Sequence, residues 1–570
     1  MVRINLEAPV SNYMKRKLDF LDINDTALNA SRLMARHKVG SIIVTRKGNP
    51  VGIVTERDML SKVLGEGRDP NRTKLKLVMS SPLITINEKA KVKDGLTLMA
   101  ENKCRRLCVV DARGQLVGLL SQEFTIIEEV DELLSRALKP AQASMRLHPR
   151  YRGKIEVSIK VPLRSFSDFA IWSSPGVAEP AKAIKRKQSL VYDYTNKWNN
   201  VAIVTDGSRV LGLGNTGPKA ALPVMEGKAI VFKYLGGIDA FPICIKSIEE
   251  KEIIEITRGI EPTFGGINLE DIEAPKCFRV LRELRKTLEI PVWHDDQQGT
   301  ATVTLAAIIN ALKVVGKKKA QVNIALIGAG AVNIALADLL IKEGYRASNI
   351  IMSDSKGIIH EGRKDIKNSP EKFEIAKITN IHHRTGGNRE ALKDADIMVG
   401  FSTPGPGIVK KEWIRSMSSD PMVIACANPV PEIWPWEAKE AGAKVVATGR
   451  SDFDNQIANT LAFPGIFRGI LDTRARKITD EICIIASKEL ADIAEEDGLS
   501  EDYILPGSAR EDVIIREAVA VGLEAQRQRL ARRKLSSRQL QTEATQIIDR
   551  ARSSIVHNIE SGIVAPFPEG

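Results

Sequence analysis

The sequence predicts an α/β protein. A small duplicated α+β module precedes one α/β domain and then a second α/β domain built on a doubly wound parallel sheet. Three observations carry this prediction: an internal repeat within residues 1–127, glycine-rich and acidic motifs within 150–298, and alternating strands and helices within 299–475. At 570 residues the chain is also too long for one hydrophobic core. We expect a helical connector at 128–149 and a helical region at 476–570.

The composition is that of a soluble globular protein, with 43% hydrophobic and 27% charged residues. The net charge of +12 is compatible with nucleic-acid binding, but the basic residues are dispersed, and the densest run, 527–533, has no interleaved aromatic residues. No apolar run is long enough to cross a bilayer, and the first residues lack an apolar signal core. Six cysteines without a CxxC pair indicate neither a disulfide framework nor a zinc site. We expect a cytoplasmic protein that binds small anions, with no nucleic acid and no membrane.

The first element in the chain is the repeat. Residues 52–58 recur in degraded form as residues 118–124, and each copy follows an amphipathic helix pattern and an apolar strand pattern. Together with the sequence at 104–111, the repeat resembles a tandem pair of cystathionine-β-synthase (CBS) domains. The resemblance implies a site for the phosphate and ribose of an adenine nucleotide at Thr55, Asp58 and Ser121. The second copy has Phe124 where the family has Asp, so a scaffold that only dimerises is the alternative.

Two acidic pairs mark the middle of the chain. Asp295 and Asp296 follow an apolar segment, and Glu270 and Asp271 lie between apolar residues. Folding would carry these carboxylates inward, and a buried carboxylate is costly unless it is paired or bound to a cation. A hard divalent cation, Mg²⁺ or Mn²⁺, suits an all-oxygen set of ligands. Ordinary solvated acidic turns are the alternative.

A lysine and a strand accompany these acidic pairs. Lys228 lies in an apolar run, where it either extends its amine to the surface or acts as a general base with a lowered pKa. The residue pattern alone favours the first interpretation. Residues 201–205 are typical of a strand, and residues 210–213, after a tight turn, predict a second strand and hence a hairpin.

The ordered motifs at 174–180, 204–207, 211–215, 222–228, 239–242, 262–271 and 294–297 closely resemble malic enzyme of the smaller, prokaryotic kind, and the resemblance continues to about residue 475. It implies oxidation and decarboxylation of L-malate to pyruvate and CO₂ with reduction of NAD or NADP. It also implies roles for individual residues. The implied metal ligands are Glu270, Asp271 and Asp296; the general base is Lys228, beside Asp295; the substrate contacts are Arg209, Asn428 and Asn459.

One position departs from that family. The family has a tyrosine three residues before the glycine of the Pro-Gly-Val turn, where it protonates the enol carbon; this chain has Ser173. A serine hydroxyl is a poor acid near neutral pH and is shorter than a phenol. Either another group, such as Tyr192, Tyr194 or a water, supplies the proton, or the last step is slow, or the protein no longer makes pyruvate efficiently.

The second α/β domain carries a dinucleotide-binding pattern. A strand at 321–327, the turn residues Gly328 and Gly330, a helix and a second strand ending at Asp354 form a Rossmann fingerprint. Asn333 takes the place of the third small residue. Asp354 is placed to accept from a ribose 2′-hydroxyl, which favours NAD, while Lys356 and Arg363 leave NADP open.

We therefore predict an NAD(P)-dependent malic enzyme that is regulated or assembled through CBS domains and forms a homodimer or a higher homo-oligomer. An enzymatic alternative is an oxaloacetate decarboxylase or related malate-converting enzyme that lacks the tyrosine acid. A second alternative is a nucleotide-sensing regulator whose catalytic half has decayed.

Overall fold

The computed structural model describes residues 9–565, except residues 13, 17, 38, 92–93, 96–97, 100–101, 103, 105, 122–142, 146, 247–248, 406, 508–509 and 511. The chain divides into two compact units, Met1–Leu147 and His148–Gly570. Phe124 and most of the connector predicted at 128–149 lie outside the described residues. Each unit is described by itself below.

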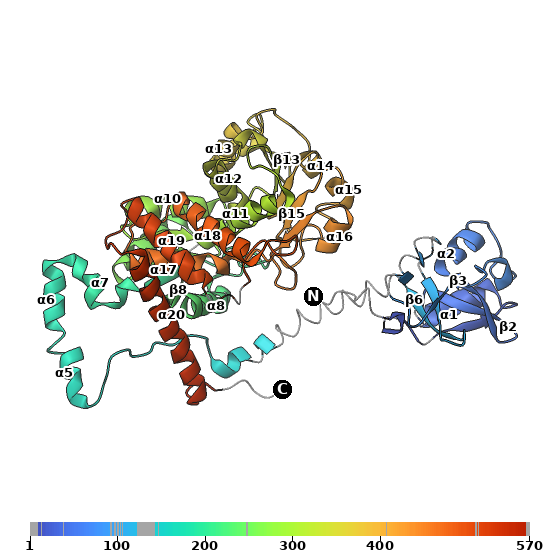
Figure 1. Ribbon diagram of the computed structural model, residues 1–570, viewed down its shortest axis with the longest axis horizontal. Coiled ribbons are helices and arrows are strands. Elements are labelled where there is room, and N and C mark those ends of the chain that lie inside the picture. The colour runs from blue at the N-terminus through green and yellow to red at the C-terminus, as the bar shows by residue number, and fades with distance from the viewer. Residues whose placement is uncertain are drawn as a thin grey trace. The chain divides into compact units, whose positions relative to one another are not determined.

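The first unit contains two copies of one three-stranded sheet (Figure 1). In each copy the first two strands are parallel and the last two antiparallel, and the register shifts at the same place, after Val44 and after Val109. This shared geometry agrees with the predicted repeat. Helix α1 (Ala27–His37) buries Ala27, Ala30 and Met34. The strands are β1 (Phe20–Asp22), β2 (Ser41–Arg46) and β3 (Asn49–Thr55), followed by the short α2 (Glu56–Asp58), then β4 (Thr85–Asn87), β5 (Arg106–Val110) and β6 (Leu116–Ser121).

The second unit begins its core with a parallel four-stranded sheet of order β10-β9-β7-β8. All residues of β7 are buried, which is typical of a central strand covered on both faces. Helices from the crossovers and from later in the chain provide the cover. The elements are β7 (Asn200–Thr205), α8 (Pro218–Gly236), β8 (Asp239–Cys244), α9 (Glu250–Ile260), β9 (Gly266–Leu269), α10 (Lys276–Thr287) and β10 (Val292–His294).

The predicted hairpin is wrong. Strand β7 pairs in parallel with β8 and β9, and residues 206–217 form a loop with one isolated bridge between Val210 and Gly214. The reason is burial, because a strand covered on both faces takes parallel neighbours whose connections cross over through helices. The turn residues after β7 instead belong to a loop at the carboxyl end of that strand.

The second sheet of this unit has six strands in the order β13-β12-β11-β14-β15-β16, with only β13 antiparallel. The order reverses between β11 and β14, where doubly wound folds bind ligands at the carboxyl ends of the strands. The elements are β11 (Ile324–Ile327), α12 (Ala331–Glu343), β12 (Ile350–Asp354), β13 (Gly357–Ile358), α13 (Pro370–Ile378), α14 (Asn388–Leu392), β14 (Ile397–Gly400), α15 (Lys411–Ile414), β15 (Met422–Ala425), α16 (Pro435–Glu440) and β16 (Val445–Thr448).

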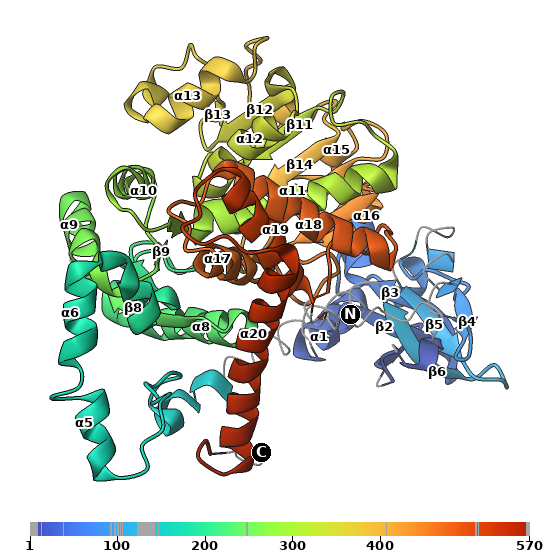
Figure 2. The same ribbon diagram turned by 60° about the vertical axis from the view of Figure 1, so that its left-hand side comes forward.

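Helix α11 (Asp295–Val315) joins the two sheets: it starts where β10 ends and packs against α12 (Figure 2). Among the described helices it alone has the length and apolarity of a membrane span, but 72% of that window is buried inside the unit. Helix α11 is therefore apolar because it packs in the hydrophobic core of this unit. Four further helices pack around α8, α11 and one another: α17 (Phe463–Asp472), α18 (Asp480–Asp497), α19 (Val513–Arg527) and α20 (Ser537–Glu560).

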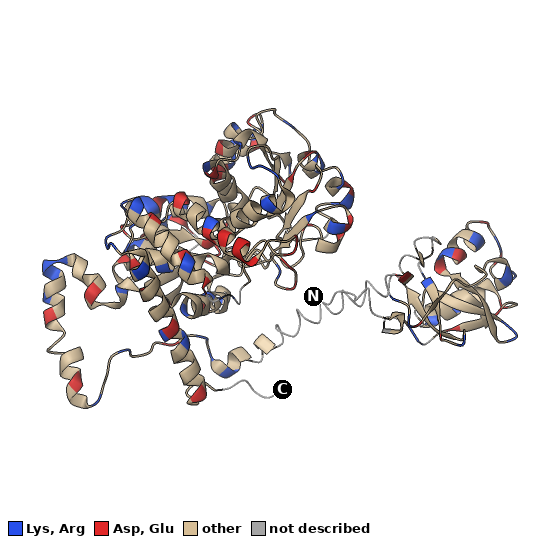
Figure 3. Cartoon of the chain, viewed as in Figure 1, with Lys and Arg blue, Asp and Glu red and all other residues tan. Residues whose placement is uncertain are grey.

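An arm at the start of this unit stays at its periphery in both ribbon views (Figures 1 and 2). It contains α5 (Phe169–Trp172), α6 (Ala178–Arg186) and α7 (Val191–Tyr194). None of the residues of α5, α6 or α7 is fully buried, and Phe166, just before α5, is 89% exposed. Elsewhere in the unit, basic and acidic side chains are interleaved along the helices (Figure 3).

Candidate functional site

Asp295, the first residue of α11, is held by three donors at the carboxyl end of β10. The indole Nε1 of Trp293 donates to Oδ1 at 3.0 Å, while Lys228 Nζ and Asn459 Nδ2 lie 2.5 Å from Oδ2. The side chain of Asp295 is fully buried. A Cβ at Gly299, one turn along α11, would overlap Asp295 Oδ1, so this close approach requires glycine.

Lys228 projects from α8 into the same cluster. Its ammonium also pairs with Glu270 Oε1 at 3.0 Å and lies 4.3 Å from the centre of the Phe463 ring. Burial lowers the pKa of Lys228, but the ion pairs with Asp295 and Glu270 together outweigh burial and raise it. The Lys228 side chain is only 11% exposed, so the surface-extension interpretation of its sequence does not apply.

The three predicted metal ligands converge from the loop after β9 and from the first turn of α11. Glu270 and Asp271 follow β9, Asp296 follows β10, and the Asp271 backbone N–H donates to Asp296 Oδ2 at 2.9 Å. Asp271 adopts a left-handed φ of 54°, a strained conformation for a residue other than glycine. Buried Asp271 Oδ2 has no hydrogen-bond partner among the described residues.

Electrostatics at these carboxylates fit a divalent cation. Burial, followed by repulsion from Asp296, raises the pKa of Asp271 to about 8, and burial raises the pKa of Glu270 well above its usual range. Within the described ranges, no three His, Cys, Asp or Glu side chains already form a coordination cluster, because Glu270 is engaged by Lys228 and by Asn268. Crowded, desolvated oxygen ligands suit Mg²⁺ or Mn²⁺ once Lys228 turns away.

A buried ion pair supports the neighbouring loops. Lys276 at the start of α10 pairs with Asp206 after β7, and Asp206 Oδ1 accepts from Ser208 Oγ at 2.6 Å. Ser208 Oγ in turn accepts the backbone N–H of Glu273 at 2.9 Å. The Arg209 backbone N–H then donates to the Asp271 carbonyl at 3.0 Å. The turn that carries Arg209 and the loop that carries Asp271 are thus tied together.

The three predicted substrate-binding residues differ in their surroundings. The Arg209 side chain is exposed, with no ion-pair partner among the described residues. Asn459 is committed to Asp295. Asn428 is exposed on a loop after β15, where its carbonyl oxygen is 2.7 Å from the position of a Cβ on Gly212. Arg450 holds this loop by donating to the Pro429 carbonyl at 2.7 Å.

The dinucleotide turn lies between β11 and α12. Gly328 has a φ of 97°, and a Cβ there would come within 2.5 Å of the Phe401 carbonyl oxygen. Gly330 caps α12 with open space beside it, at the helix end where a pyrophosphate is favoured. The fully buried Asn333 donates to the carbonyls of Ile327 and Gly328, so its amide binds α12 to the strand instead of loosening the packing. Asp354 ends β12, as its role requires.

Ser173 does not join the cluster. It is exposed at the end of α5, where its backbone N–H donates to Phe169. Tyr194 is 53% exposed, and the ring of Tyr192 lies among Lys197, Arg474 and Arg532. No described contact joins these three hydroxyls to Lys228 or Asp295.

In the first unit, Thr55 and Asp58 meet at the corner between β3 and α2. Thr55 Oγ1 donates to Asp58 Oδ2 at 2.7 Å, and Lys62 pairs with Asp58 Oδ1 at 2.7 Å. Ser121 ends β6, the matching strand of the second copy. The two predicted copies of the nucleotide corner therefore occupy equivalent places in their sheets.

Sequence reasoning missed the supporting residues around the site. Asp206, Lys276, Trp293 and Phe463 contact candidate residues or hold their loops. Asp206 follows an apolar strand as Asp295 does, and this placement was a usable signal. The pairing of Lys276 with Asp206 depends on a crossover between strands and had no local signal.

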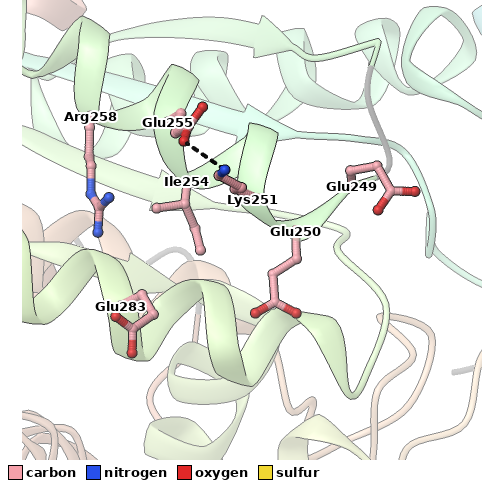
Figure 4. A pocket seen from close by; sticks show the side chains of 7 residues that line it. All are labelled: Glu249, Glu250, Lys251, Ile254, Glu255, Arg258 and Glu283. Carbon is pink, nitrogen blue, oxygen red and sulfur yellow. Dashed lines mark ion pairs between the residues drawn. The ribbon is translucent and has the colours of Figure 1, made fainter.

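A surface depression between α9 and α10 is separate from this cluster (Figure 4). None of its lining residues belongs to the predicted site. They are Glu249, Glu250, Lys251, Ile254, Glu255, Arg258 and Glu283.

Comparison with known families agrees with both units. Residues 10–65 and 75–123 match the CBS domain, residues 152–252 match the malic enzyme N-terminal domain, and residues 297–526 match the malic enzyme NAD binding domain. The last match extends beyond the second sheet and includes helices α17, α18 and α19.

Individual relatives match this chain over nearly their whole length. The chain is 49% identical to a bifunctional malic/malolactic enzyme of Bacillus subtilis over 69% of this chain and 94% of that protein. It is 42% identical to an NADP-dependent malic enzyme of Halomonas elongata over 69% of this chain and 95% of that protein. The crystal structure of malic enzyme from Pyrococcus horikoshii matches with 50% identity and a TM-score of 0.69, over 71% of this chain and 94% of that one.

Proposed function

This chain belongs to the malic enzyme family, and on that premise we propose that it oxidises and decarboxylates L-malate to pyruvate and CO₂ with reduction of NAD or NADP. The observation that carries the proposal is the cluster formed by buried Lys228, Glu270, Asp271 and Asp295 with the partly exposed Asp296 beside them. These groups match, residue by residue, the base and metal ligands expected from the family.

Each group has a chemical task in this reaction. Neutral Lys228 would accept the proton of the malate C2 hydroxyl, and a bound nicotinamide would supply the acceptor for the C2 hydride. Asp295, fixed by Trp293 and Asn459, keeps the amine in place. The exposed guanidinium of Arg209 is free to grip a substrate carboxylate through two parallel hydrogen bonds.

A divalent cation held by Glu270, Asp271 and Asp296 would polarise the C2 oxygen and stabilise the enolate left by loss of CO₂. The protonated state of Lys228 also supports a cation. Of the two ion pairs that raise its pKa, the one with Glu270 would weaken when Glu270 holds the cation, while the one with Asp295 would remain. The change would lower the pKa of Lys228 in the direction that a base requires.

The last step, protonation of the enol carbon C3, has no tyrosine in this chain. Ser173 stands at that position on the exposed arm, so we propose that this step is slow relative to malate oxidation. Oxaloacetate or enolpyruvate would then build up before pyruvate.

The CBS pair and a second copy of the chain complete the proposal. Thr55, Asp58 and Ser121 are proposed to hold an adenine nucleotide. Exposed apolar residues of the arm, such as Val157 at 87% and Phe166 at 89%, favour cover by a second copy, because a soluble monomer rarely exposes such a surface. Sedimentation of the wild type and of Phe166→Glu tests this homodimer. A cytoplasmic location stays a prediction.

The activity is tested by an anaerobic assay of the full chain with L-malate, Mn²⁺ and either NAD or NADP, in which reduced cofactor and pyruvate are both followed. Cofactor reduction that runs ahead of pyruvate at first, followed by an equal amount of pyruvate, is the expected result. Lys228→Ala should lose about 10²–10⁴-fold in the rate of oxidation, the usual contribution of general base catalysis. Lys219→Ala, on the exposed first turn of α8, is the matched control.

Other outcomes separate the alternatives. Cofactor reduction with lasting oxaloacetate would place the defect after oxidation and favour the enzyme that lacks the tyrosine acid. Nucleotide binding without any malate turnover would favour a regulator with a decayed catalytic half. Wild-type activity in Lys228→Ala would refute the assignment of the base.

A further inference from the structure

Arg363 lies beside the end of β12, and all of its N–H groups donate hydrogen bonds within the protein. Arg363 Nη1 donates to Asp354 Oδ1 at 2.8 Å and to the Gly357 carbonyl at 2.9 Å. Nη2 donates to Asp354 Oδ2 at 3.2 Å and to Asp365 Oδ2 at 2.7 Å, and Nε donates to Asp365 Oδ1 at 3.1 Å. A guanidinium has five N–H groups, so none remains for a ligand.

Asp354 is equally engaged. Its Oδ1 accepts from Arg363 and from the backbone N–H of Lys356 at 3.0 Å; its Oδ2 accepts from Arg363 and from Lys372 Nζ at 3.0 Å. The side chain of Lys372 is 27% exposed, against 11% for Arg363. Lys372 is therefore the partner that moves most easily when a ligand arrives.

This inference rests on the proposed function, because it concerns the ribose of the dinucleotide that the second sheet would bind. Asp354 stands at the strand end where such folds hold that ribose. A 2′-hydroxyl donates a hydrogen bond and can replace Lys372 on Asp354. A 2′-phosphate is anionic and would be repelled by Asp354, while the arginine that would balance its charge is held by Asp354 and Asp365.

We propose that Asp365 is a positioning residue for cofactor choice: it holds Arg363 on Asp354, so that the end of β12 accepts the 2′-hydroxyl of NAD and discriminates against the 2′-phosphate of NADP. Asp365 itself contacts neither ribose nor phosphate. Its effect passes through two of the five donors of Arg363.

Two nearby lysines favour binding of a 2′-phosphate. Lys356 lies 3.4 Å from Asp365 with its side chain 69% exposed, and Lys372 is free to turn outward. Both attract a phosphate, but as flexible point charges they lack the fixed two-pronged geometry of an arginine. The hydrogen bonds that Arg363 donates to Asp365 first, and then to Asp354, also raise the pKa of Arg363, in keeping with an arginine held by two carboxylates.

The test measures binding of NADH and NADPH to the full chain by fluorescence titration without divalent metal, and kcat/KM for NAD and NADP with it. The wild type should bind NADH at least about tenfold more tightly than NADPH. Asp365→Asn removes the negative charge and one of the two acceptor oxygens, which frees one donor of Arg363. It should lower this ratio by about tenfold or more, mainly through tighter NADPH, as one charge-assisted hydrogen bond would. Asp365→Glu should restore most of the preference.

The matched control is Glu361→Gln, which removes one exposed carboxylate from the same loop without touching Arg363. An equal shift in this control would show a general charge effect and overturn the role of Asp365. Equal or tighter NADPH binding by the wild type, or an unchanged ratio in Asp365→Asn, would also overturn it. Binding of neither NADH nor NADPH would instead refute the proposed function itself.

Discussion

The chemical role open to each residue of the site depends on its burial and on its hydrogen-bond partners. Lys228 and Asp295 form a pair in which Asp295 is fully buried and further held by Trp293 and Asn459. Ser173 is exposed and makes no described contact with this pair. At this position the chain has a serine where the family resemblance implies a tyrosine acid.

Replacing that serine tests the change directly. Where the arm brings position 173 to the substrate during turnover, Ser173→Tyr should raise the rate of pyruvate formation from malate by about tenfold or more, because a general acid contributes at least that much once it is positioned. The rate of cofactor reduction in the first turnover should change little, which stopped-flow measurements can separate. Ser173→Phe supplies the ring without the hydroxyl and is the matched control. If both variants behave alike, protonation by this residue does not limit the reaction.

Helices and loops of the second unit are joined by buried polar groups whose partners cannot be predicted from the local sequence. The ion pair between Lys276 and Asp206 joins α10 to the end of β7, and Ser208 extends it to the loop after β9. Another buried group, Glu517 on α19, packs its carboxyl group against Gly465 of α17. Neither oxygen of Glu517 has a hydrogen-bond partner among the described residues.

Breaking the buried ion pair should loosen the metal loop. In Lys276→Met, Asp206 is left buried without its partner, and Mn²⁺ affinity should fall by about 10–100-fold, as for other residues that hold ligand loops. Electron paramagnetic resonance of free Mn²⁺ measures this without turnover. The double variant Asp206→Asn/Lys276→Met removes both charges and should recover part of the loss. Wild-type Mn²⁺ affinity in Lys276→Met would contradict the supporting role.

Glu517 should make stability depend on pH. Burial first, and then repulsion from Glu489, raises the pKa of Glu517 well above its usual range, so the folded state binds a proton that the unfolded state releases above about pH 4.5. This contribution to stability is complete below that pH and is lost as pH rises towards the raised pKa.

Glu517→Gln removes the titration and should become more stable relative to wild type as pH rises, by up to about 1.4 kcal/mol per pH unit. Thermal unfolding of both proteins between pH 4.5 and 8 measures the gap. Glu560→Gln, at the exposed end of α20, is the control. A gap that stays constant with pH, or narrows, would show that Glu517 is charged in the folded protein.

The whole molecule combines a sensor-like unit with a catalytic one. The first unit places Thr55 and Asp58 at one nucleotide corner, with Ser121 at the matching strand end of the second copy. Within the second unit, the C-terminal helices belong to the core: fully buried Arg468 of α17 donates to Asp472 and to Asn199, just before β7. The four-stranded sheet, the six-stranded sheet and the C-terminal helices therefore belong to one compact unit.

At this scale we expect one adenine nucleotide per chain, bound at the first copy. Asp58→Ala should weaken AMP or ATP binding by about tenfold or more, because it removes a charged hydrogen-bond acceptor, and should abolish any effect of the nucleotide on malate kinetics. Ser121→Ala, in the copy that has Phe124, should have the smaller effect. Isothermal titration calorimetry with both nucleotides measures this; equal losses in the two variants would argue against a single site.

Local sequence patterns by themselves determined the repeat, the doubly wound sheet, the glycine turn before α12 and the carboxylates that follow β9 and β10, because strands, turns and strand ends leave signals within a few residues. The parallel pairing of β7, the clamp on Asp295, the links from Lys276 and Asn333, and the saturation of Arg363 were decided only by the tertiary structure. Each of these depends on groups brought together by crossovers or loops, and burial then fixes which partner each polar atom takes. The position of Ser173 in the sequence shows that it replaces the family's tyrosine. Only the tertiary structure shows that the arm holds it away from the site.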